Sequence, residues 1–256
     1  LILSCNTGEG HNSCAKAIQE TYAAHGETCD IVDALQFISK RASQFISDWH
    51  SRIYRHAPKL YKAGYHTAEE RTSVFREGTT VYRYLTSGSE KLYHFILDGG
   101  YDNIICTHVF PALALTAMLK HHPMPLVTSF VSTDYTCSPS VENSELDYYF
   151  IPDISLTEEF VQCGVPREKL IDSGMPVKQA FYQDTDKAAA KAELGLPADH
   201  QHLLVMCGSI GCGPIKELTE DLLIRLTSEQ ELTIVCGANE ELFAKLERHF
   251  AHDPRI

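Results

Sequence analysis

The chain opens with the stretch Leu1-Ile2-Leu3-Ser4-Cys5-Asn6-Thr7-Gly8-Glu9-Gly10-His11-Asn12-Ser13, which decides the fold that we expect. Residues 1–4 are apolar enough to form a buried strand. Residues 13–25 then carry apolar side chains at helical spacing, and Gly26 follows as a stop signal. A strand, a glycine-bearing loop and a helix in this order predict the first unit of a Rossmann-like, doubly wound α/β domain.

The alternation of strand and helix continues along the chain. Further strands are predicted at residues 29–34, 103–106, 126–131, 148–151 and 170–173, and helices at residues 112–120 and 156–163. A short alanine-rich helix at 187–194 and a Gly195-Leu196-Pro197 break then interrupt the pattern. It restarts with strands at 203–207 and 232–236 and helices at 215–226 and 240–250. This order predicts parallel sheets.

Two Rossmann-like starts joined by a linker are typical of the GT-B architecture, in which two α/β domains enclose a cleft. We therefore predict an N-terminal domain over residues 1–175, a linker over 176–201 and a C-terminal domain that starts at residue 202. Two strands and two helices are too few for a stable nucleotide-binding sheet. We accordingly expect the second domain to be incomplete and the chain to be a fragment.

The loop after the first strand is predicted to contact a substrate. Gly8 and Gly10 let the backbone turn tightly and approach a ligand, and the helix that follows Asn12 offers unpaired N–H groups to an anion. His11 beside that helix N-terminus is disfavoured in its charged form, which makes it a candidate neutral base. The alternative is a surface histidine in a turn. The spacing Gly-x-Gly-His also differs from the dinucleotide pattern Gly-x-Gly-x-x-Gly.

Two more polar loops follow strands at the same predicted edge of the sheet. Thr107 and His108 come after the strand at 103–106, and Ser132-Thr133-Asp134-Tyr135 comes after the strand at 126–131. Open α/β sheets bind ligands at the carboxyl ends of their strands. Thr and Asp can equally cap a turn, so each loop alone is a weak signal. Three polar loops at one edge together favour a site.

The second half carries a glycine-rich loop of its own. Gly208, Ser209 and Gly211 follow one strand and precede a helix, which predicts a cradle for a diphosphate. Two such loops in separate domains predict a cleft between them. The single Asp-x-Asp, Asp184-Thr185-Asp186, precedes the alanine-rich helix, where we expect capping rather than metal binding.

Composition argues against several other functions. A net charge of −12 disfavours a nucleic-acid partner. The nine cysteines lack Cys-x-x-Cys spacing, and several lie in apolar runs, which is typical of free thiols in a reducing cytoplasm. We expect no metal and no other cofactor. No apolar run approaches the roughly 20 residues that span a bilayer, and no leader is recognisable, so we expect a soluble or peripheral protein.

Six short motifs occur in order along the chain: Gly8-x-Gly10-His11-x-x-x-Ala15-x-Ala17-Ile18, Thr107-His108, Thr133-Asp134-Tyr135, Gly164-Val165-Pro166, Gly174-Met175-Pro176-Val177 and Gly208-Ser209-x-Gly211. With them, the sequence resembles the monogalactosyldiacylglycerol synthases of chloroplasts and the processive diacylglycerol glucosyltransferases of Gram-positive bacteria. It resembles the MurG glycosyltransferase of peptidoglycan synthesis more distantly. The resemblance covers essentially the whole chain.

The resemblance implies a metal-independent, inverting transfer of a hexose from an α-linked UDP-sugar to a lipid hydroxyl, such as that of diacylglycerol, at the cytoplasmic face of the cell membrane. It implies that His11 is the base or orients the base, and that Asp134 faces the acceptor. The positions that match the family's donor-binding residues are Gly208, Ser209, Gly211 and Lys178, the last standing where the MurG branch has an arginine near the uridine.

The chain departs from the family pattern after Tyr135. The lipid synthases usually show a His and a Trp there, whereas this sequence continues with Ser138-Pro139-Ser140-Val141. A polyprenyl-linked or other lipid acceptor therefore remains an alternative. A nucleotide-sugar-binding or membrane-binding protein without catalysis remains another.

The segment 36–95 differs in charge from the rest of the chain. It holds ten Lys or Arg against five acidic residues, interleaved with Tyr, Phe and Trp49. Cations beside aromatic side chains suit an anionic membrane surface. The alternative is a pair of helices whose aromatic side chains are core and whose charges are solvated. In the resembling enzymes this region is the membrane-docking insertion on the acceptor side, so we expect it to bind an anionic membrane.

Overall fold

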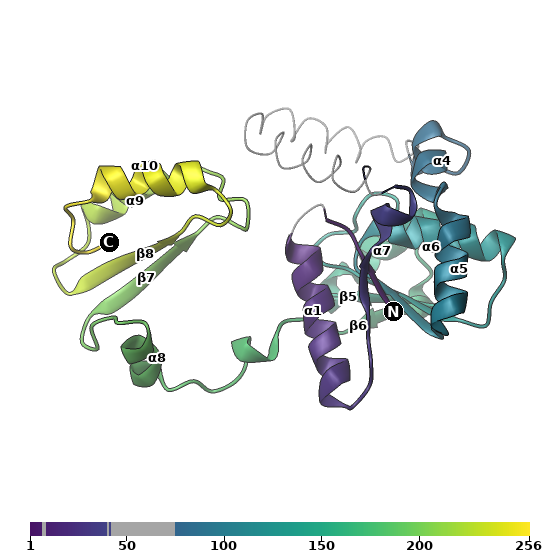
Figure 1. Ribbon diagram of the computed structural model, residues 1–256, viewed down its shortest axis with the longest axis horizontal. Coiled ribbons are helices and arrows are strands. Elements are labelled where there is room, and N and C mark those ends of the chain that lie inside the picture. Colours follow the sequence, from purple (N-terminus) through teal and green to yellow (C-terminus); the bar gives the residue numbers. More distant parts are fainter. Residues whose placement is uncertain (7–8, 40, 42–74) are drawn as a thin grey trace. The chain divides into compact units, whose positions relative to one another are not determined.

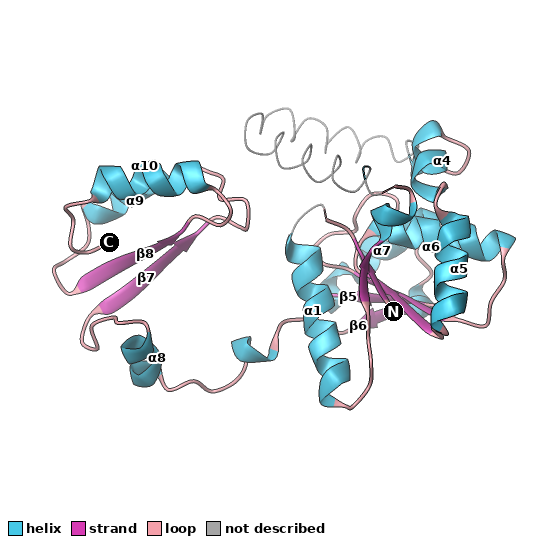
Figure 2. Cartoon of the chain, viewed as in Figure 1, coloured by secondary structure: helices cyan, strands magenta, loops and turns pink. Residues whose placement is uncertain are grey.

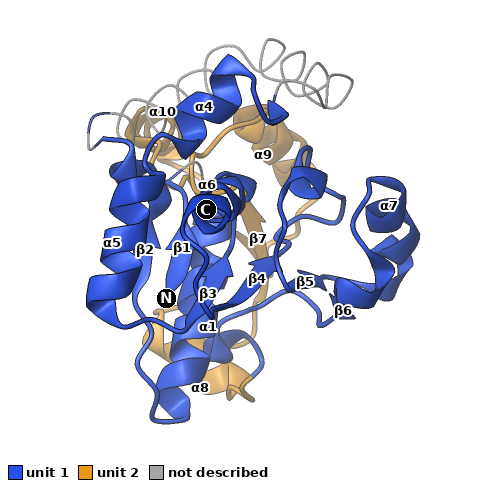
Figure 3. Ribbon diagram, turned by 90° about the vertical axis from the view of Figure 1, so that its right-hand side faces the viewer, with its two compact units in different colours: residues 1–53, 57–182 blue, residues 54–56, 183–256 orange. Residues whose placement is uncertain are grey.

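The computed structural model describes residues 1–6, 9–39, 41 and 75–256. The chain forms two compact units (Figure 3). The boundary lies between Tyr182 and Gln183, inside the segment predicted as a linker. Gly8 and residues 42–74, which include most of the predicted membrane-binding segment, lie outside the described residues. Unit 1 therefore refers below to the described residues up to 182, and unit 2 to residues 183–256.

Unit 1 contains a six-stranded parallel sheet in the order β2-β1-β3-β4-β5-β6, whose strands are labelled in Figure 3; Figure 1 shows the same unit from another side. Its strands are β1 (Ile2–Ser4), β2 (Ile31–Asp33), β3 (Asn103–Cys106), β4 (Val127–Val131), β5 (Tyr148–Ile151) and β6 (Leu170–Asp172). β1 is an interior strand, because Ile2 pairs with Ile31 of β2 on one side and with Ile105 of β3 on the other. The order of strands therefore reverses between β1 and β3, and ligands of open α/β sheets bind at such switch points.

Helices connect these strands, and short 3₁₀ turns lie between them (Figure 2). The helices of unit 1 are α1 (Glu9–Ala24), α4 (Thr80–Thr86), α5 (Ser89–Gly99), α6 (Val109–His121) and α7 (Thr157–Gln162). The 3₁₀ turns are η1 (Ala34–Phe37), η3 (Val141–Asn143), η4 (Ile154–Leu156), η5 (Arg167–Lys169) and η6 (Gln179–Phe181).

The sheet is covered on both faces, as expected for a doubly wound fold. Successive strand residues point to opposite faces. Ile2 and Ile105 accordingly pack with Ala15 of α1, whereas Leu3 and Ile104 belong to the larger core that α5 and α6 contribute to. Burial of these apolar side chains, at roughly 25 cal/mol per Å², drives the layers together.

A buried tyrosine adds a polar anchor to the larger core. The hydroxyl of Tyr149 on β5 donates to the Ser144 carbonyl oxygen at 2.7 Å and accepts from the Leu146 N–H at 3.1 Å. Tyr149 is 1% exposed, so these bonds replace the water that its hydroxyl loses on folding.

Helix α4 and most of helix α5 lie in the described part of the basic, aromatic segment. In α4, Tyr82 is buried, whereas Val81 and Tyr84 are exposed. The aromatic side chains of this helix are thus divided between the core and the surface. No helix in the described parts of the chain is both long and apolar enough to cross a bilayer.

Unit 2 contains the parallel pair β7 (Gln201–Met206) and β8 (Gln230–Val235), with helices α8 (Lys187–Glu193), α9 (Ile215–Leu223) and α10 (Glu240–Phe250). Its small core includes Ile215, Cys236 and Leu246. Asp186 caps α8 by accepting from the N–H groups of Ala188 and Ala189. The prediction that the Asp-x-Asp motif serves as a cap is therefore confirmed for Asp186.

Candidate active site

The first glycine-bearing segment is largely helical rather than a loop. We predicted the helix from Ser13, but α1 begins at Glu9, so Gly10, His11 and Asn12 lie in its first turn. An acidic residue in the first turn stabilises a helix, and Glu9 supplies one. Gly10 has an ordinary backbone conformation, and a Cβ there would meet no described atom within 4 Å. The expectation that Gly10 makes a tight turn is therefore wrong.

The side chain of His11 lies at the switch point between β1 and β3. Its Nδ1 is 2.9 Å from the carbonyl oxygen of Thr107, at the end of β3. The hydroxyl of Thr133, at the end of β4, is 2.7 Å from the same nitrogen. The first turn of α1, which follows β1, and the segments after β3 and β4 therefore meet at the His11 imidazole, as the strand-end rule predicts.

The contact with Thr107 bears on which ring nitrogen carries the proton. A carbonyl oxygen only accepts, so this contact favours the tautomer in which Nδ1 carries the hydrogen, and the Thr133 hydroxyl then accepts at Nδ1 rather than donating to it. The neutral ring then has its lone pair on Nε2. Burial lowers the pKa of His11 below its usual 6.5, and the charge of Asp134 and the hydrogen bond to Thr107 raise it only in part. His11 is thus a neutral imidazole with Nε2 as its proton acceptor.

Asp134 is near enough to His11 to act on its charge, and it is itself exposed. The hydroxyl of Ser132 donates to the Asp134 carbonyl oxygen at 3.1 Å, which shapes the loop after β4. An exposed carboxylate beside a histidine stabilises the imidazolium form that appears when the ring accepts a proton. The structure thus brings the two predicted catalytic side chains together.

His108 takes a structural role beside this site. Its Nδ1 accepts from the Phe110 N–H at 3.0 Å and so caps α6. The predicted helix start at 112 is three residues late for this reason. The His108 ring packs edge-to-face on His11, with 4.6 Å between ring centroids. Thr107 is fully buried, and its hydroxyl has no partner among the described residues.

Asn12 belongs to a chain of polar side chains that fixes the start of α1. Its Oδ1 accepts from the Ser4 hydroxyl at 2.7 Å, and its Nδ2 donates to Asn6 Oδ1 at 3.1 Å. Asn6 in turn donates to Asp33 at the end of β2. Asn12 therefore ties the turn that carries His11 to β1 and β2, a positioning role.

The predicted donor loop of unit 2 is locked against the loop that follows β8. The Ser209 carbonyl accepts from the Ala238 N–H at 2.7 Å, and the Gly211 carbonyl accepts from Asn239 Nδ2 at 2.8 Å. Gly211 has φ +63°, and a Cβ on it would overlap the carbonyl oxygen of Cys236. Glycine is therefore required at 211 for packing. Gly208 also has positive φ, and Ser209 is exposed ahead of α9.

Lys178 directly precedes η6 and belongs to unit 1, whereas Ser209 belongs to unit 2. Over the described residues, no group of three or more His, Cys, Asp or Glu side chains is arranged to hold a metal ion. Independence of metals and cofactors stays a prediction.

One residue that positions the site was not foreseen. Glu159 of α7 accepts from the Thr136 hydroxyl at 2.5 Å and from the Cys137 N–H at 2.7 Å, which anchors the loop that carries Asp134. The sequence did not predict this role, because Glu159 is one of two adjacent acidic residues on a short helix and nothing distinguishes it from its neighbour. Thr133 follows the strand-end rule and was foreseen only as part of a motif.

Relatives among curated proteins match nearly the whole length of this chain. The processive diacylglycerol beta-glucosyltransferase of Bacillus mycoides is 24% identical over 247 residues, which cover 94% of this chain and 61% of the relative. The protein of the same name from Staphylococcus saprophyticus is 22% identical over 254 residues, which cover 98% and 62%. The chain thus spans about three fifths of the length of these relatives.

Solved structures show the same fold. The S. aureus MnaA–UDP co-structure aligns with a TM-score of 0.55 at 11% identity over 100% of this chain and 66% of that chain. A UDP-N-acetylglucosamine 2-epimerase aligns with a TM-score of 0.53 at 9% identity over 99% and 66%. The predicted GT-B α/β fold is confirmed.

The family-level sequence pattern of monogalactosyldiacylglycerol (MGDG) synthase matches residues 11–177, more than half of the chain. The match begins at His11 and covers Thr107, Thr133 and Asp134, the residues that meet at the switch point. The chain therefore belongs to the monogalactosyldiacylglycerol synthase family.

Proposed function

We propose that the chain forms part of an inverting glycosyltransferase that moves a hexose from a UDP-sugar to the hydroxyl of diacylglycerol and gives a β-linked glycolipid. The observation that carries the proposal is the state of His11. Its Nδ1–H is held by the Thr107 carbonyl and its pKa is lowered by burial, so Nε2 is a neutral base at the switch point of the sheet.

The proposed reaction needs a base and a charge partner. Nε2 of His11 takes the proton from the acceptor hydroxyl while the acceptor oxygen bonds to the sugar C1. The bond from C1 to the diphosphate oxygen breaks on the opposite face, and its electron pair leaves with UDP. Attack opposite to the leaving group converts an α-linked donor into a β-linked product. Asp134 stabilises the imidazolium that forms.

The donor diphosphate is assigned to unit 2. Ser209 is exposed at the loop before α9, and the bonds between the loops after β7 and β8 hold its backbone in place. A rigid loop at a helix N-terminus offers fixed N–H dipoles to a developing negative charge. Lys178 is proposed to add a positive charge near the nucleotide, without a metal ion.

A peripheral position at the inner face of the cell membrane is part of the proposal. Helix α4 exposes Val81 and Tyr84 beside the exposed Arg83. Apolar side chains next to a cation suit the headgroup region of an anionic leaflet, where each cation contributes about 1 kcal/mol.

The test uses the full-length protein that contains this chain, labelled UDP-glucose or UDP-galactose, and diacylglycerol vesicles, with and without a chelator. We expect β-linked glycolipid in both conditions. His11→Ala should reduce turnover about 10²–10⁴-fold. His25→Ala is the matched control, since His25 is an exposed residue that directly follows the other end of the same helix.

The segment after Tyr135 departs from the family pattern, so transfer to a polyprenyl-linked acceptor is the alternative. Vesicles that contain such an acceptor in place of diacylglycerol test it. Transfer to that acceptor alone would overturn the diacylglycerol assignment. UDP-sugar binding without transfer to either acceptor would overturn the enzymatic proposal as a whole.

A further inference from the structure

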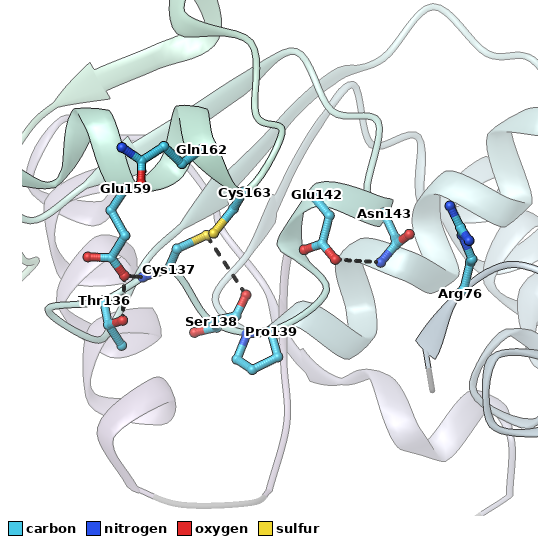
Figure 4. Close-up of a pocket in the computed structure, with 10 residues that line it drawn as sticks. All are labelled: Arg76, Thr136, Cys137, Ser138, Pro139, Glu142, Asn143, Glu159, Gln162 and Cys163. Atoms are coloured by element: carbon cyan, nitrogen blue, oxygen red, sulfur yellow. Dashed lines mark hydrogen bonds between the residues drawn. The ribbon is translucent and has the colours of Figure 1, made fainter. Parts of the chain in front are cut away.

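Two cysteines from different segments of unit 1 lie together beside the loop that follows β4. Cys137 belongs to that loop, and Cys163 is the C-cap of α7. Both line one cavity of about 600 Å³, and Figure 4 shows their sulfur atoms next to each other. Cys163 acts on Cys137 by charge and by a side-chain hydrogen bond, so the two thiols are within hydrogen-bonding range. Each is a free thiol in this structure.

The geometry of α7 explains why the two side chains meet. Cys163 follows Glu159 by four positions, and its N–H donates to the Glu159 carbonyl oxygen at 3.0 Å. Residues four apart in a helical turn lie on one face. The Glu159 carboxylate on that face accepts from the Cys137 N–H at 2.7 Å. The backbone of Cys137 is therefore held beside the helix end that carries the Cys163 thiol, before any bond joins the two sulfur atoms.

The two thiols differ in their access to solvent. Cys163 is exposed, whereas Cys137 is only 8% exposed. Burial raises the pKa of the Cys137 thiol, and the neighbouring Cys163 raises that pKa further. Cys137 is therefore protonated at neutral pH, and Cys163 is the sulfur that a small oxidant in solution reaches first. An accessible thiol beside a second, protected thiol is typical of redox-sensing cysteines.

Another pair of cysteines in unit 1 lacks this access. The charge of Cys106 raises the pKa of Cys5, so these two thiols also lie near each other. Both are fully buried, however, and reactivity toward oxidants follows exposure. The solvent-accessible member of the pair at α7 distinguishes it from the pair in the core.

We propose that Cys137 and Cys163 are a redox-reactive pair, which hydrogen peroxide converts into a reversible disulfide between the loop after β4 and the end of α7. This modification site does not depend on the transferase reaction. It would fasten the segment that carries Asp134 at the point where Glu159 already holds it.

The chemistry proceeds in two steps. The Cys163 thiolate attacks one oxygen of the peroxide, the O–O bond breaks, and Cys163 becomes a sulfenic acid while hydroxide leaves. The Cys137 sulfur then bonds to the Cys163 sulfur, and the S–O bond breaks and releases a second hydroxide. The protons of the two thiols convert both hydroxides to water. Two thiols are thus oxidised to one disulfide, and one peroxide is reduced to two waters. An external dithiol reverses the change by thiol–disulfide exchange.

The disulfide should stabilise the local structure rather than distort it, because the backbone is already in place. It closes a ring of roughly 27 residues, which removes conformational entropy from the unfolded chain. It also adds a covalent bond to the hydrogen bonds that Glu159 accepts from the same loop. Opening of the loop after β4 should therefore become rarer, which amide hydrogen exchange measures.

The test uses the full-length protein that contains this chain, fully reduced and then treated with hydrogen peroxide. Digestion without reductant should give a peptide pair bridged between Cys137 and Cys163, which dithiothreitol separates. Hydrogen exchange in the peptide that follows β4 should slow about tenfold or more on oxidation and recover on reduction.

Three variants separate the pair from the other thiols. Cys163→Ser should abolish both the bridged peptide and the slower exchange. Cys137→Ser should leave Cys163 as a sulfenic acid that dimedone traps. If Cys137→Ser fails to fold, Cys163→Ser still tests the pair at an exposed position. Cys29→Ser is the matched control and should change neither result, since Cys29 is a partly exposed thiol just before β2.

Several results would overturn the proposed pair. They are the absence of any bridge at Cys163, a bridge from Cys163 to a different cysteine or to a second molecule, and a bridged peptide that persists in Cys163→Ser. Unchanged hydrogen exchange in the bridged protein would overturn the fastening of the loop. None of these measurements involves sugar transfer, so failure of the proposed function would leave them unaffected.

Discussion

Removing the charge of Asp134 distinguishes the base from the group that supports it. If His11 is the base, Asp134→Asn removes one stabilising charge from the imidazolium. Asp134 is exposed, and exposed charge pairs contribute about 0.2–1 kcal/mol. This corresponds to a loss of roughly 1.4- to 5-fold in kcat/KM. His11→Ala removes the proton acceptor itself and should cost about 10²–10⁴-fold.

The pH profile gives a second measurement of the same assignment. Because burial keeps the pKa of His11 below 6.5, more than about nine tenths of it is neutral at about pH 7.5. The acid limb of kcat/KM should therefore lie below pH 6.5. Asp134 raises the pKa of His11, so Asp134→Asn should move the limb to still lower pH. The assay is initial-rate transfer to diacylglycerol vesicles in a constant-ionic-strength buffer series.

Two results would refute this assignment. If the acid limb of kcat/KM moved to higher pH in Asp134→Asn, Asp134 would not be a carboxylate that raises the pKa of His11. A loss as large as that of His11→Ala would identify Asp134 as the base. Stability offers a check on the sign, since a depressed histidine pKa adds stability that is present above pH 6.5 and lost as the pH falls through the folded value. His11→Ala should reduce that part of the acid sensitivity.

Three further changes test the packing around these sites. Gly211→Ala should lower the free energy of unfolding of unit 2 by about 3–4 kcal/mol in urea titrations. The loss comes from a side chain at positive φ and from two broken hydrogen bonds between the loops after β7 and β8. In the control Gly10→Ala, the free energy of unfolding should stay within about 1 kcal/mol of the parent value. Tyr149→Phe should cost about 1–3 kcal/mol in thermal unfolding, because its buried partners lose their hydrogen bonds; an unchanged midpoint would show that they find others. Iodoacetamide should modify the exposed Cys163 well before Cys106, whose pKa burial raises, as peptide mass spectrometry would show; equal rates would contradict the burial.

The sequence was most informative where one physical signal dominates. The strands at 103–106 and 148–151 have the predicted bounds, because buried parallel strands are short apolar runs between polar turns. The predicted starts at 187, 215 and 240 are those of α8, α9 and α10, whereas two helix starts in unit 1 were predicted too late. α1 begins at Glu9 rather than Ser13, and α6 is capped by His108, a residue type that is not among the usual caps.

The candidate site was predictable to the extent that it follows from strand ends. His11, Thr107 and Asp134 each follow a strand, and parallel strands bring their carboxyl ends together. The packing role of Gly211 was not predictable, because it depends on the approach of a carbonyl from residue 236. The positioning role of Glu159 was not predictable for a similar reason, since its hydrogen bonds to residues 136 and 137 join segments that lie 22–23 positions apart in the sequence.

The two hydrogen bonds that Glu159 accepts from the loop after β4 determine which positions of that loop tolerate substitution. One of its two contacts is to the backbone N–H of Cys137, a group that every residue except proline supplies. The other needs only a hydroxyl at position 136. Side chains from 137 onward can therefore be substituted, proline excepted at 137, without loss of the two hydrogen bonds of Glu159. Asp134 then keeps its position while the side chains that follow it change. The place of Asp134 thus depends on one backbone N–H and one hydroxyl, and not on the side chains that follow them.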